Sequence, residues 1–273
     1  MPVHLMRAGA LVLACLLPWQ TSLAAGRCER LVATGGADNP PFLWEDPAQP
    51  GRLVGAHAEL LQNIAATLGV KLDLLASGDA SQALDEVASG RADLLLDVPL
   101  REALLTRFDF VHPPLAQRQH LAWVRQDPAA PETLEALAGL NGVRVPGPDA
   151  APLASGAPEP APREHGDLSR ALQQLAGGEI DYLVHPRQAT IVWAAELGLL
   201  DRIRPIEPPL ASESLHLALA HDSACNDAWL RGQLALRMTA LVAGGVPQRL
   251  VAEHLDRWLA AQHDAAAEPI LED

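Results

Sequence analysis

In the first half of the chain, stretches with the apolar spacing of a helix alternate with short apolar runs typical of strands. At 57–70, HAELLQNIAATLGV, apolar residues recur every three or four positions, which predicts a helix that ends at its glycine. Short apolar runs at 29–36 and 71–76 are typical of strands. A second helix is predicted at 81–90 and a strand at 91–99. This order predicts a mostly parallel sheet with crossover helices.

The second half continues the alternation. The segment 132–148, ETLEALAGLNGVRVPGP, predicts a helix, a turn and a strand. The other predicted elements are strands at 120–125, 180–184 and 212–222 and helices at 168–175, 191–201, 225–245 and 247–262. The pattern as a whole predicts an α/β fold.

Two stretches of the chain are nearly the same. SQALDEVASGRADLLLDVP begins at Ser81 and SRALQQLAGGEIDYLVHPR begins at Ser169, and they share serine, alanine, leucine, glycine and aspartate at one constant offset. Each copy is a helix–strand step, and open α/β sheets bind ligands at the carboxyl ends of strands. The repetition fits two facing lobes. The same step also occurs in any α/β protein, so both interpretations stay open.

The N-terminus has the features of an export signal. Arg7 precedes the apolar run ALVLACLLPW, and Ser22-Leu23-Ala24 is a small-x-small cleavage site, which predicts a signal peptide over 1–25. The run is too short to span a bilayer, and Pro18 interrupts it. A lipoprotein signal ending at Cys15 is a weaker alternative. We therefore expect a mature protein in the periplasm.

Charge excludes one class of partner. The formal net charge is −14, with a single lysine and no basic cluster. A strongly acidic protein repels nucleic acid and anionic lipid, so neither is expected to bind.

Two cysteines, Cys28 and Cys225, remain after the predicted signal is removed. In an exported protein this favours a disulfide over two free thiols, on the grounds of compartment alone.

The chain contains ten histidines, but none lies in an HxH or HExxH motif. His216 and His221 would face opposite sides of an extended strand. No GxSxG, P-loop or GxGxxG motif is present. We therefore expect neither a metal nor a cofactor.

The ordered set of segments resembles the periplasmic solute-binding proteins of family 3. The resemblance rests on NPPFLWED, GRLVGAHAELLQNIAATLGVKLDLL, ALDEVASGRADLLL, RFDFVHPPL, LEALAGLNGVRV, ALQQLAGGEIDYLV and the closing HLDRWL. It implies a type-2 periplasmic-binding fold of two α/β lobes joined by two hinge crossings, near HLAWVR and SESLHLALAHD. Lobe 1 would comprise 26–120, completed by 218–265, and lobe 2 would comprise 121–217. A disordered tail is expected at 266–273. The first strand and the C-terminal helices would share lobe 1, so the two cysteines would meet.

The chain departs from the family at three positions that anchor amino acids. The arginine that pairs with a ligand carboxylate falls on Leu104 or Leu105, and an alkyl group does not replace a bidentate guanidinium. The Gly-Ser or Gly-Thr at a helix start is replaced by PGPDAAPLASGAPEPAP, whose prolines forbid a regular helix. The acceptor of the ligand ammonium is replaced by His185-Pro186-Arg187.

The resemblance also indicates where a ligand would bind. Arg101 and Arg187 are the expected cations, and Trp44 is the expected stacking surface for an anionic or aromatic molecule. The ligand-binding residues expected from the resemblance are Asn39, Phe42, Trp44, Asp97, Arg101, His185 and Arg187.

These features give three hypotheses for function. The first is a monomeric receptor that captures a small solute, other than a standard amino acid, and delivers it to the membrane permease of an ABC-type transporter. The second is an enzyme on the same scaffold, similar to the cyclohexadienyl dehydratases, with His185, Asp97 and Arg101 as base, acid and carboxylate clamp. The third is an exported accessory protein without a ligand. A receptor binds without turnover, an enzyme consumes the compound, and an accessory protein does neither.

Overall fold

A computed structural model describes residues 28–146 and 158–267 of the chain. Its strands are, in chain order, β1 (Arg30–Gly36), β2 (Asp38–Asn39), β3 (Leu43–Glu45), β4 (Leu53–Val54), β5 (Lys71–Ser77), β6 (Leu94–Pro99), β7 (Phe108–Phe110), β8 (Ala116–Arg125), β9 (Gly142–Arg144), β10 (Arg163–Glu164), β11 (Tyr182–Pro186) and β12 (Ile203–Ala220). Its α-helices are α1 (Ala56–Leu68), α2 (Ala80–Ala88), α3 (Leu168–Gly177), α4 (Arg187–Glu196), α5 (Ala228–Ala243) and α6 (Val246–Ala267). Its 3-10 turns are η1 (Glu102–Leu104), η2 (Glu135–Leu137) and η3 (Leu200–Arg202).

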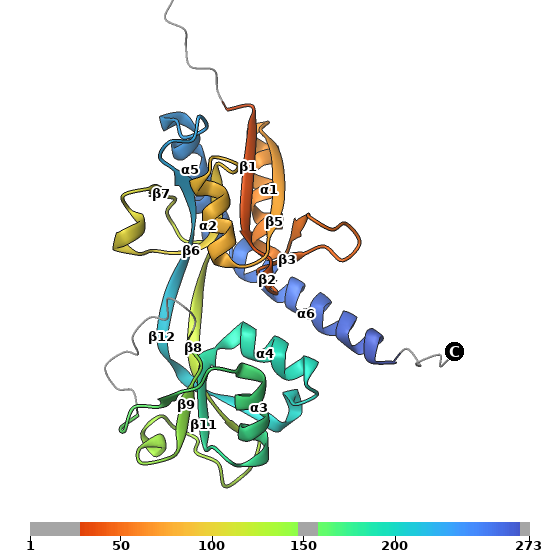
Figure 1. Cartoon of the computed structure of the whole chain (residues 1–273), viewed down its shortest axis with the longest axis vertical. Coiled ribbons are helices and arrows are strands. Elements are labelled where there is room, and N and C mark those ends of the chain that lie inside the picture. Colours follow the sequence, from red (N-terminus) through yellow and green to blue (C-terminus); the bar gives the residue numbers. More distant parts are fainter. Residues whose placement is uncertain (1–27, 147–157, 268–273) are drawn as a thin grey trace, which may run out of the picture.

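One nine-stranded sheet of the described residues runs through two lobes in the order β10-β9-β11-β8-β12-β6-β1-β5, with β7 paired to β12. β5, β1 and β6 are parallel in lobe 1, and β10, β9 and β11 are parallel in lobe 2. The antiparallel pair β8 and β12 joins the lobes, as Figure 1 shows. The α/β fold with two crossings is therefore confirmed. We call residues 116–120 and 211–215, where β8 and β12 pair between the lobes, the hinge.

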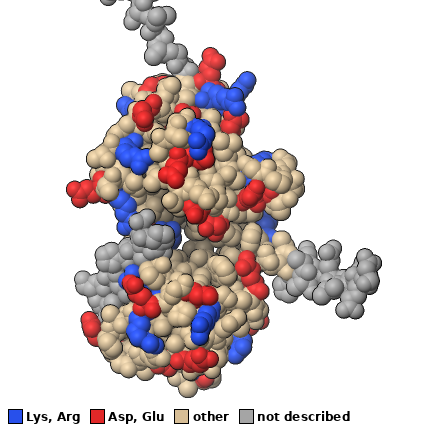
Figure 2. All heavy atoms as spheres, in the orientation of Figure 1, with Lys and Arg blue, Asp and Glu red and all other residues tan. Residues whose placement is uncertain are grey.

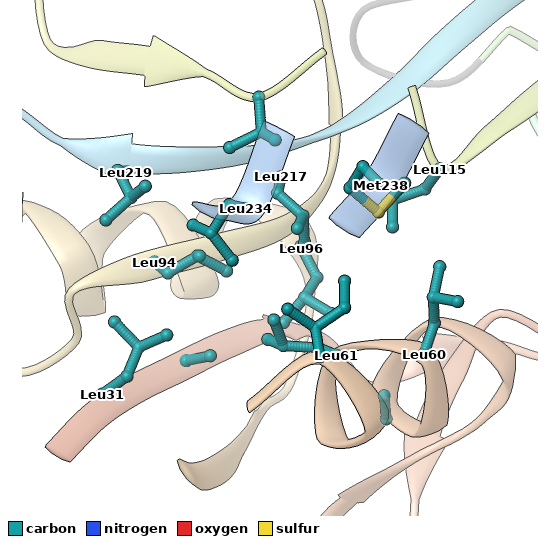
Figure 3. Close-up of a cluster of buried hydrophobic side chains, with 14 of the residues drawn as sticks. Leu31, Leu60, Leu61, Leu94, Leu96, Leu115, Leu217, Leu219, Leu234 and Met238 are labelled. Carbon is teal, nitrogen blue, oxygen red and sulfur yellow. The ribbon is translucent and has the colours of Figure 1, made fainter. Parts of the chain in front are cut away.

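The core of lobe 1 lies between the sheet and α1 with α5. β-Strands bury alternate side chains on each face, so leucines of neighbouring strands meet the apolar face of α1. Figure 3 shows this cluster, which includes Leu31, Leu60, Leu61, Leu94, Leu96, Leu217, Leu219 and Leu234. α2 covers the opposite face with Ala83 and Val87.

Lobe 2 has its own core on both faces of the sheet. α3 and α4 pack against one face, where Leu121 and Leu183 are fully buried. Tyr182 fills the other face with η2 and the first half of β12, which contributes Ile206 and Leu210. Gly142 lies beneath the Tyr182 ring, and a Cβ there would be 1.9 Å from its Cζ atom. A glycine is therefore required in β9.

The repeated phrase forms the same structure twice. Asp79 caps α2 and Asp167 caps α3, each accepting a hydrogen bond from a backbone N–H of its first turn. The aspartates that precede the following strands also match. Asp93 accepts from the N–H of Val32 at 2.9 Å, and Asp181 accepts from the N–H of Asn141 at 2.9 Å. Each aspartate therefore fastens its strand to the neighbouring one, in lobe 1 and in lobe 2.

Several predicted elements differ in the structure. The helix predicted within 132–148 is wrong, because only the 3-10 turn η2 forms between Pro131 and Gly139. The last strand is much longer than 212–222, since it begins at Ile203 and runs through a proline-rich stretch. α4 begins at Arg187, four residues before the predicted start.

The two ends of the chain lie partly outside the described residues. The predicted signal peptide and residues 268–273 of the predicted tail are outside them. α6 extends to Ala267, and it packs against α1 and α5 in lobe 1 and against α4 in lobe 2. Among the described residues, no helix combines the length and apolar character that crossing a membrane requires.

Cys28 and Cys225 form the expected disulfide, with their Cα atoms 4.9 Å apart. Cys28 precedes β1 and Cys225 precedes α5, so the bond ties the first strand of lobe 1 to its C-terminal helices. Both residues are buried.

Candidate functional site

The end of β6 carries a β-bulge next to the hinge. Leu95 pairs with Ala218 and Val98 pairs with His216, so β6 holds one more residue than β12 across this step. Asp97 lies in the bulge with φ at 61°, and it is the single non-glycine residue with positive φ in the described parts of the chain. A left-handed backbone is strained for most residues but tolerated by aspartate. Such strain is concentrated at functional sites.

His57 holds the side chain of Asp97. It lies in the first turn of α1, fully buried, and its Nδ1 hydrogen-bonds to Oδ1 of Asp97. Phe42 stacks on the imidazole with ring centroids 4.9 Å apart. Nε2 of His57 and Oδ2 of Asp97 are buried and have no hydrogen-bond partner among the described residues. An unsatisfied buried polar atom costs about 1–3 kcal/mol, so this arrangement calls for an explanation.

Arg101, Glu213 and Arg118 form a charged row across the hinge. Glu213 on β12 is 7% exposed, and its two carboxylate oxygens bind Arg101 and Arg118 separately. The register pairs Arg118 directly with Glu213 on neighbouring strands, and Arg101 follows β6 on the other side. Two cations share one anion, so the row carries a net charge of about +1.

His185 lies at the end of β11, at the lobe 2 side of the hinge. Burial first, and then the nearby His120 and Arg118, lower its pKa to about 3. Thr190 donates its hydroxyl proton to the carbonyl of Pro186 at 2.8 Å. Nδ1 of His185, 3.0 Å from the same hydroxyl oxygen, must therefore be the donor in that pair. His185 is thus neutral at physiological pH, with Nε2 as an acceptor.

Other polar groups surround this end of lobe 2. His120 on β8 is half-buried, and burial followed by the charge of Arg118 lowers its pKa. Arg144 ends β9 beside β11, 4.0 Å from the exposed Glu164. The carboxyl ends of β9 and β11 therefore bring a cation and a neutral imidazole to the edge where α/β sheets bind ligands.

The remaining predicted ligand residues lie elsewhere. Arg187, the first residue of α4, binds Glu207 and is 3.4 Å from Gln119. Trp44 on β3 contacts the rings of His254 and Trp258 of α6, each 5.5 Å away.

Trp44 lines a cavity of about 350 Å³ between α1, the β3–β4 hairpin and α6. Asn39 lies on β2, where it pairs with Leu43 of β3. A larger cavity of about 550 Å³ lies at the edge strand β5, away from the hinge.

The three positions expected to anchor an amino acid lie in different parts of the fold. Leu105 follows η1, and its uncharged side chain is 51% exposed. Pro186 ends β11 and precedes α4. The proline-rich segment expected at the second anchor, the helix start, falls largely on 147–157, outside the described residues.

The structure thus brings some predicted residues together and separates others. Phe42 lies beside the Asp97 pair, and Arg101 lies at the hinge. Sequence reasoning missed His57, Arg118 and Glu213. A histidine two residues after the glycine that opens a helix was the available signal for His57, whereas the other two depend on strand register.

No group of three or more histidine, cysteine, aspartate or glutamate residues lies close enough to hold a metal ion within residues 28–146 and 158–267.

Figure 2 shows lysine and arginine interspersed with aspartate and glutamate over both lobes, and the surface narrows between the lobes.

Comparisons with known proteins agree with this architecture. The family model described as bacterial extracellular solute-binding proteins, family 3, matches residues 31–254. No curated protein matches the chain.

Many solved structures share the fold. Substrate-binding domain 2 of Lactococcus lactis GlnP in its open conformation is 17% identical with a TM-score of 0.65, and the match covers 84% of this chain and 96% of that one. The second substrate-binding domain of a putative amino acid ABC transporter from Streptococcus pneumoniae is 17% identical with a TM-score of 0.64, covering 82% and 99%. A histidine kinase sensor domain similar to periplasmic binding proteins is 21% identical with a TM-score of 0.58, covering 84% and 97%.

Proposed function

Because this chain belongs to the bacterial extracellular solute-binding proteins, family 3, we propose that it captures a small solute between its lobes and delivers it to an ABC-type transporter. Proteins of this family are in general binders rather than enzymes. In this proposal the mature protein is a periplasmic monomer. Lobe 1 comprises 26–120 with 218–265, lobe 2 comprises 121–217, and the permease of the transporter is the partner.

The ligand of this proposal is a small anion other than a standard amino acid. The single observation that carries the exclusion of standard amino acids is that leucine, either Leu104 or the exposed Leu105, occupies the position where the family resemblance expects an arginine clamp. Pro186 at the ammonium position supplies no negative charge, and the neighbouring His185 is neutral. An amino acid would therefore bring its ammonium group without the acidic partner expected at this position, and a buried unpaired charge costs several kcal/mol.

The cations at the hinge supply the attraction for an anion. Arg101 and Arg118 each bind one oxygen of the Glu213 carboxylate, so two guanidinium groups lie together at the hinge. Arg187 is largely balanced by Glu207 and serves as a second, weaker candidate. Arginine suits this role because its fork binds a carboxylate bidentately.

Calorimetry tests the proposal directly. The twenty standard amino acids are titrated alongside small mono- and dicarboxylates at pH 7. We expect no amino acid with a sub-micromolar dissociation constant, and saturable binding of at least one carboxylate. A sub-micromolar amino acid would contradict the proposal.

Two variants test the assigned cations. Arg101→Ala should weaken carboxylate binding by about tenfold or more, the equivalent of at least about 1.4 kcal/mol, and Arg187→Ala should weaken it less. If neither changes it, these two assignments are wrong even though the family is right. Chromatography of the incubated compound separates binding from turnover, since an enzyme on this scaffold would consume it.

Export has a separate test. Mass spectrometry of the protein from a periplasmic extract should give a chain that starts near Ala25 or Gly26. An intact Met1, or a lipid on Cys15, would contradict this proposal.

A further inference from the structure

The bulge at the end of β6 orients Asp97 toward α1. Leu94 and Leu96 belong to the core that α1 covers, while Leu95 and Val98 belong to the core that α2 covers. In a regular strand Asp97 would share the α2 face with Leu95, because side chains alternate. The extra residue places Leu96 and Asp97 successively on the α1 side. The fold therefore uses a bulge and a left-handed residue to bring this carboxylate to His57.

We infer that Asp97, positioned by His57, is a ligand anchor that accepts a hydrogen bond from a hydroxyl group, so that the solute is a small hydroxycarboxylate. This inference rests on the proposed function, since the carboxylate end of the ligand is assigned to the row Arg101–Glu213–Arg118. The hydroxyl end is assigned to Oδ2 of Asp97.

The free oxygen carries the first step of the argument. Oδ1 of Asp97 is engaged by Nδ1 of His57, and Oδ2 has no partner in the described parts of the chain although the side chain is only 9% exposed. A carboxylate accepts hydrogen bonds and donates none. The missing partner is therefore a donor from outside these residues. The end of β6 is where a parallel sheet places its ligands, and Figure 1 shows that end beside the strands that join the lobes.

The number of donors decides between a hydroxyl and an ammonium. A hydroxyl brings one O–H, which one oxygen satisfies. An ammonium brings three N–H groups and a full charge, and the apolar ring of Phe42, packed on His57, offers no acceptor. Burying an ammonium with one partner leaves donors unsatisfied. The site therefore favours the hydroxyl.

His57 fixes the geometry of the anchor. It is enclosed between Phe42 and Asp97 and has no exposed surface, so its imidazole has one accessible arrangement. It is a positioning residue, because it acts on the ligand only by orienting the Asp97 carboxylate. Its substitution should therefore change the selectivity for the hydroxyl more than the affinity for the carboxylate.

Matched pairs of acids test the anchor in the intact protein. Calorimetry compares D- and L-malate with succinate, D- and L-lactate with propionate, and citrate with tricarballylate, since the members of each pair differ only in the hydroxyl. We expect at least one hydroxy acid to bind about 5- to 150-fold more tightly than its deoxy partner, the range that follows from leaving one buried acceptor unsatisfied.

Variants of the anchor separate binding from folding. Asp97→Asn and Asp97→Gly both tolerate the left-handed backbone, and glycine removes the strain. Both should retain the melting temperature of the wild type within a few degrees. Asp97→Gly has no side-chain acceptor and should reduce the hydroxy-to-deoxy ratio to about 1, whereas the amide of Asp97→Asn still hydrogen-bonds and should lower the ratio less. The deoxy acids should bind as before. His57→Gln should lower the same ratio. Asp73→Asn, an exposed carboxylate on β5 paired with Arg30, is the matched control and should change nothing.

Each outcome decides between the two proposals. If hydroxy and deoxy acids bind equally to the wild type, anion capture stands and the Asp97 anchor is wrong. The anchor is also wrong if Asp97→Gly leaves the ratio unchanged, which is the result expected if Oδ2 binds only an ordered water. If none of the acids binds, both proposals fail together. Should a variant not fold, the wild-type ratio alone decides.

Discussion

Removal of the Cys28–Cys225 disulfide should destabilise the protein by several kcal/mol. The bond joins residues 197 positions apart, so it closes a loop that contains most of the described chain. In the chain-entropy model a loop of this length restricts the unfolded state by about 5 kcal/mol at 25 °C. Measured losses for native disulfides are about 2–5 kcal/mol, and we expect the upper half of that range.

The measurement is urea denaturation followed by tryptophan fluorescence. The double variant Cys28→Ser, Cys225→Ser is compared with the wild type, with and without dithiothreitol. With a slope of about 2–3 kcal/mol/M, the midpoint should fall by about 1–2 M. The reduced wild type is the control, because it lacks the same bond without any substitution and should match the double variant.

Two results would refute this reasoning. One is a loss below about 1 kcal/mol in both the variant and the reduced wild type, which would mean that the loop does not restrict the unfolded chain. The other is two titratable thiols in the unfolded, unreduced protein, which would show that the bond does not form.

Three further predictions follow from packing and charge. Gly142→Ala should lower the free energy of unfolding by more than about 2 kcal/mol, measured by urea denaturation, because the new Cβ would overlap the ring of Tyr182. Because the pKa of His185 is lowered in the folded state, the unfolded state binds a proton at this residue at a higher pH than the folded state does. Stability should therefore fall by up to about 1.4 kcal/mol per pH unit between about pH 6 and 4, and His185→Gln should show a shallower pH dependence; equal slopes would contradict this. Glu213→Gln should lower stability by about 1–3 kcal/mol, because two arginines lose their shared charge. The control, Glu207→Gln, removes a 56% exposed partner and should change stability by less than about 1 kcal/mol, and similar losses in the two variants would count against a special role for Glu213.

The family resemblance and the cysteine pair could be predicted from the sequence, but the ligand chemistry depends on positions where this chain departs from the pattern. In our proposal, Pro186 and a leucine at 104 or 105 stand where the resemblance expects the anchors of an amino acid. These positions do not indicate which groups bind the ligand instead, because the proposed groups come from other parts of the chain. His57 and Asp97 are separated by 40 residues, and Arg101 and Glu213 by 112.

Local signals along the sequence determined the helices and parallel strands of both lobes. The capping residues Asp79 and Asp167 and the apolar periods act within a few residues, so the repeated phrase folds twice in the same way. Only the tertiary structure decided the register of β6, β8 and β12. That register inserts the bulge at Asp97 and aligns Glu213 between two arginines. Strand pairing is set by the joint burial of distant segments and not by any local preference, so these contacts depend on how both lobes pack around the hinge.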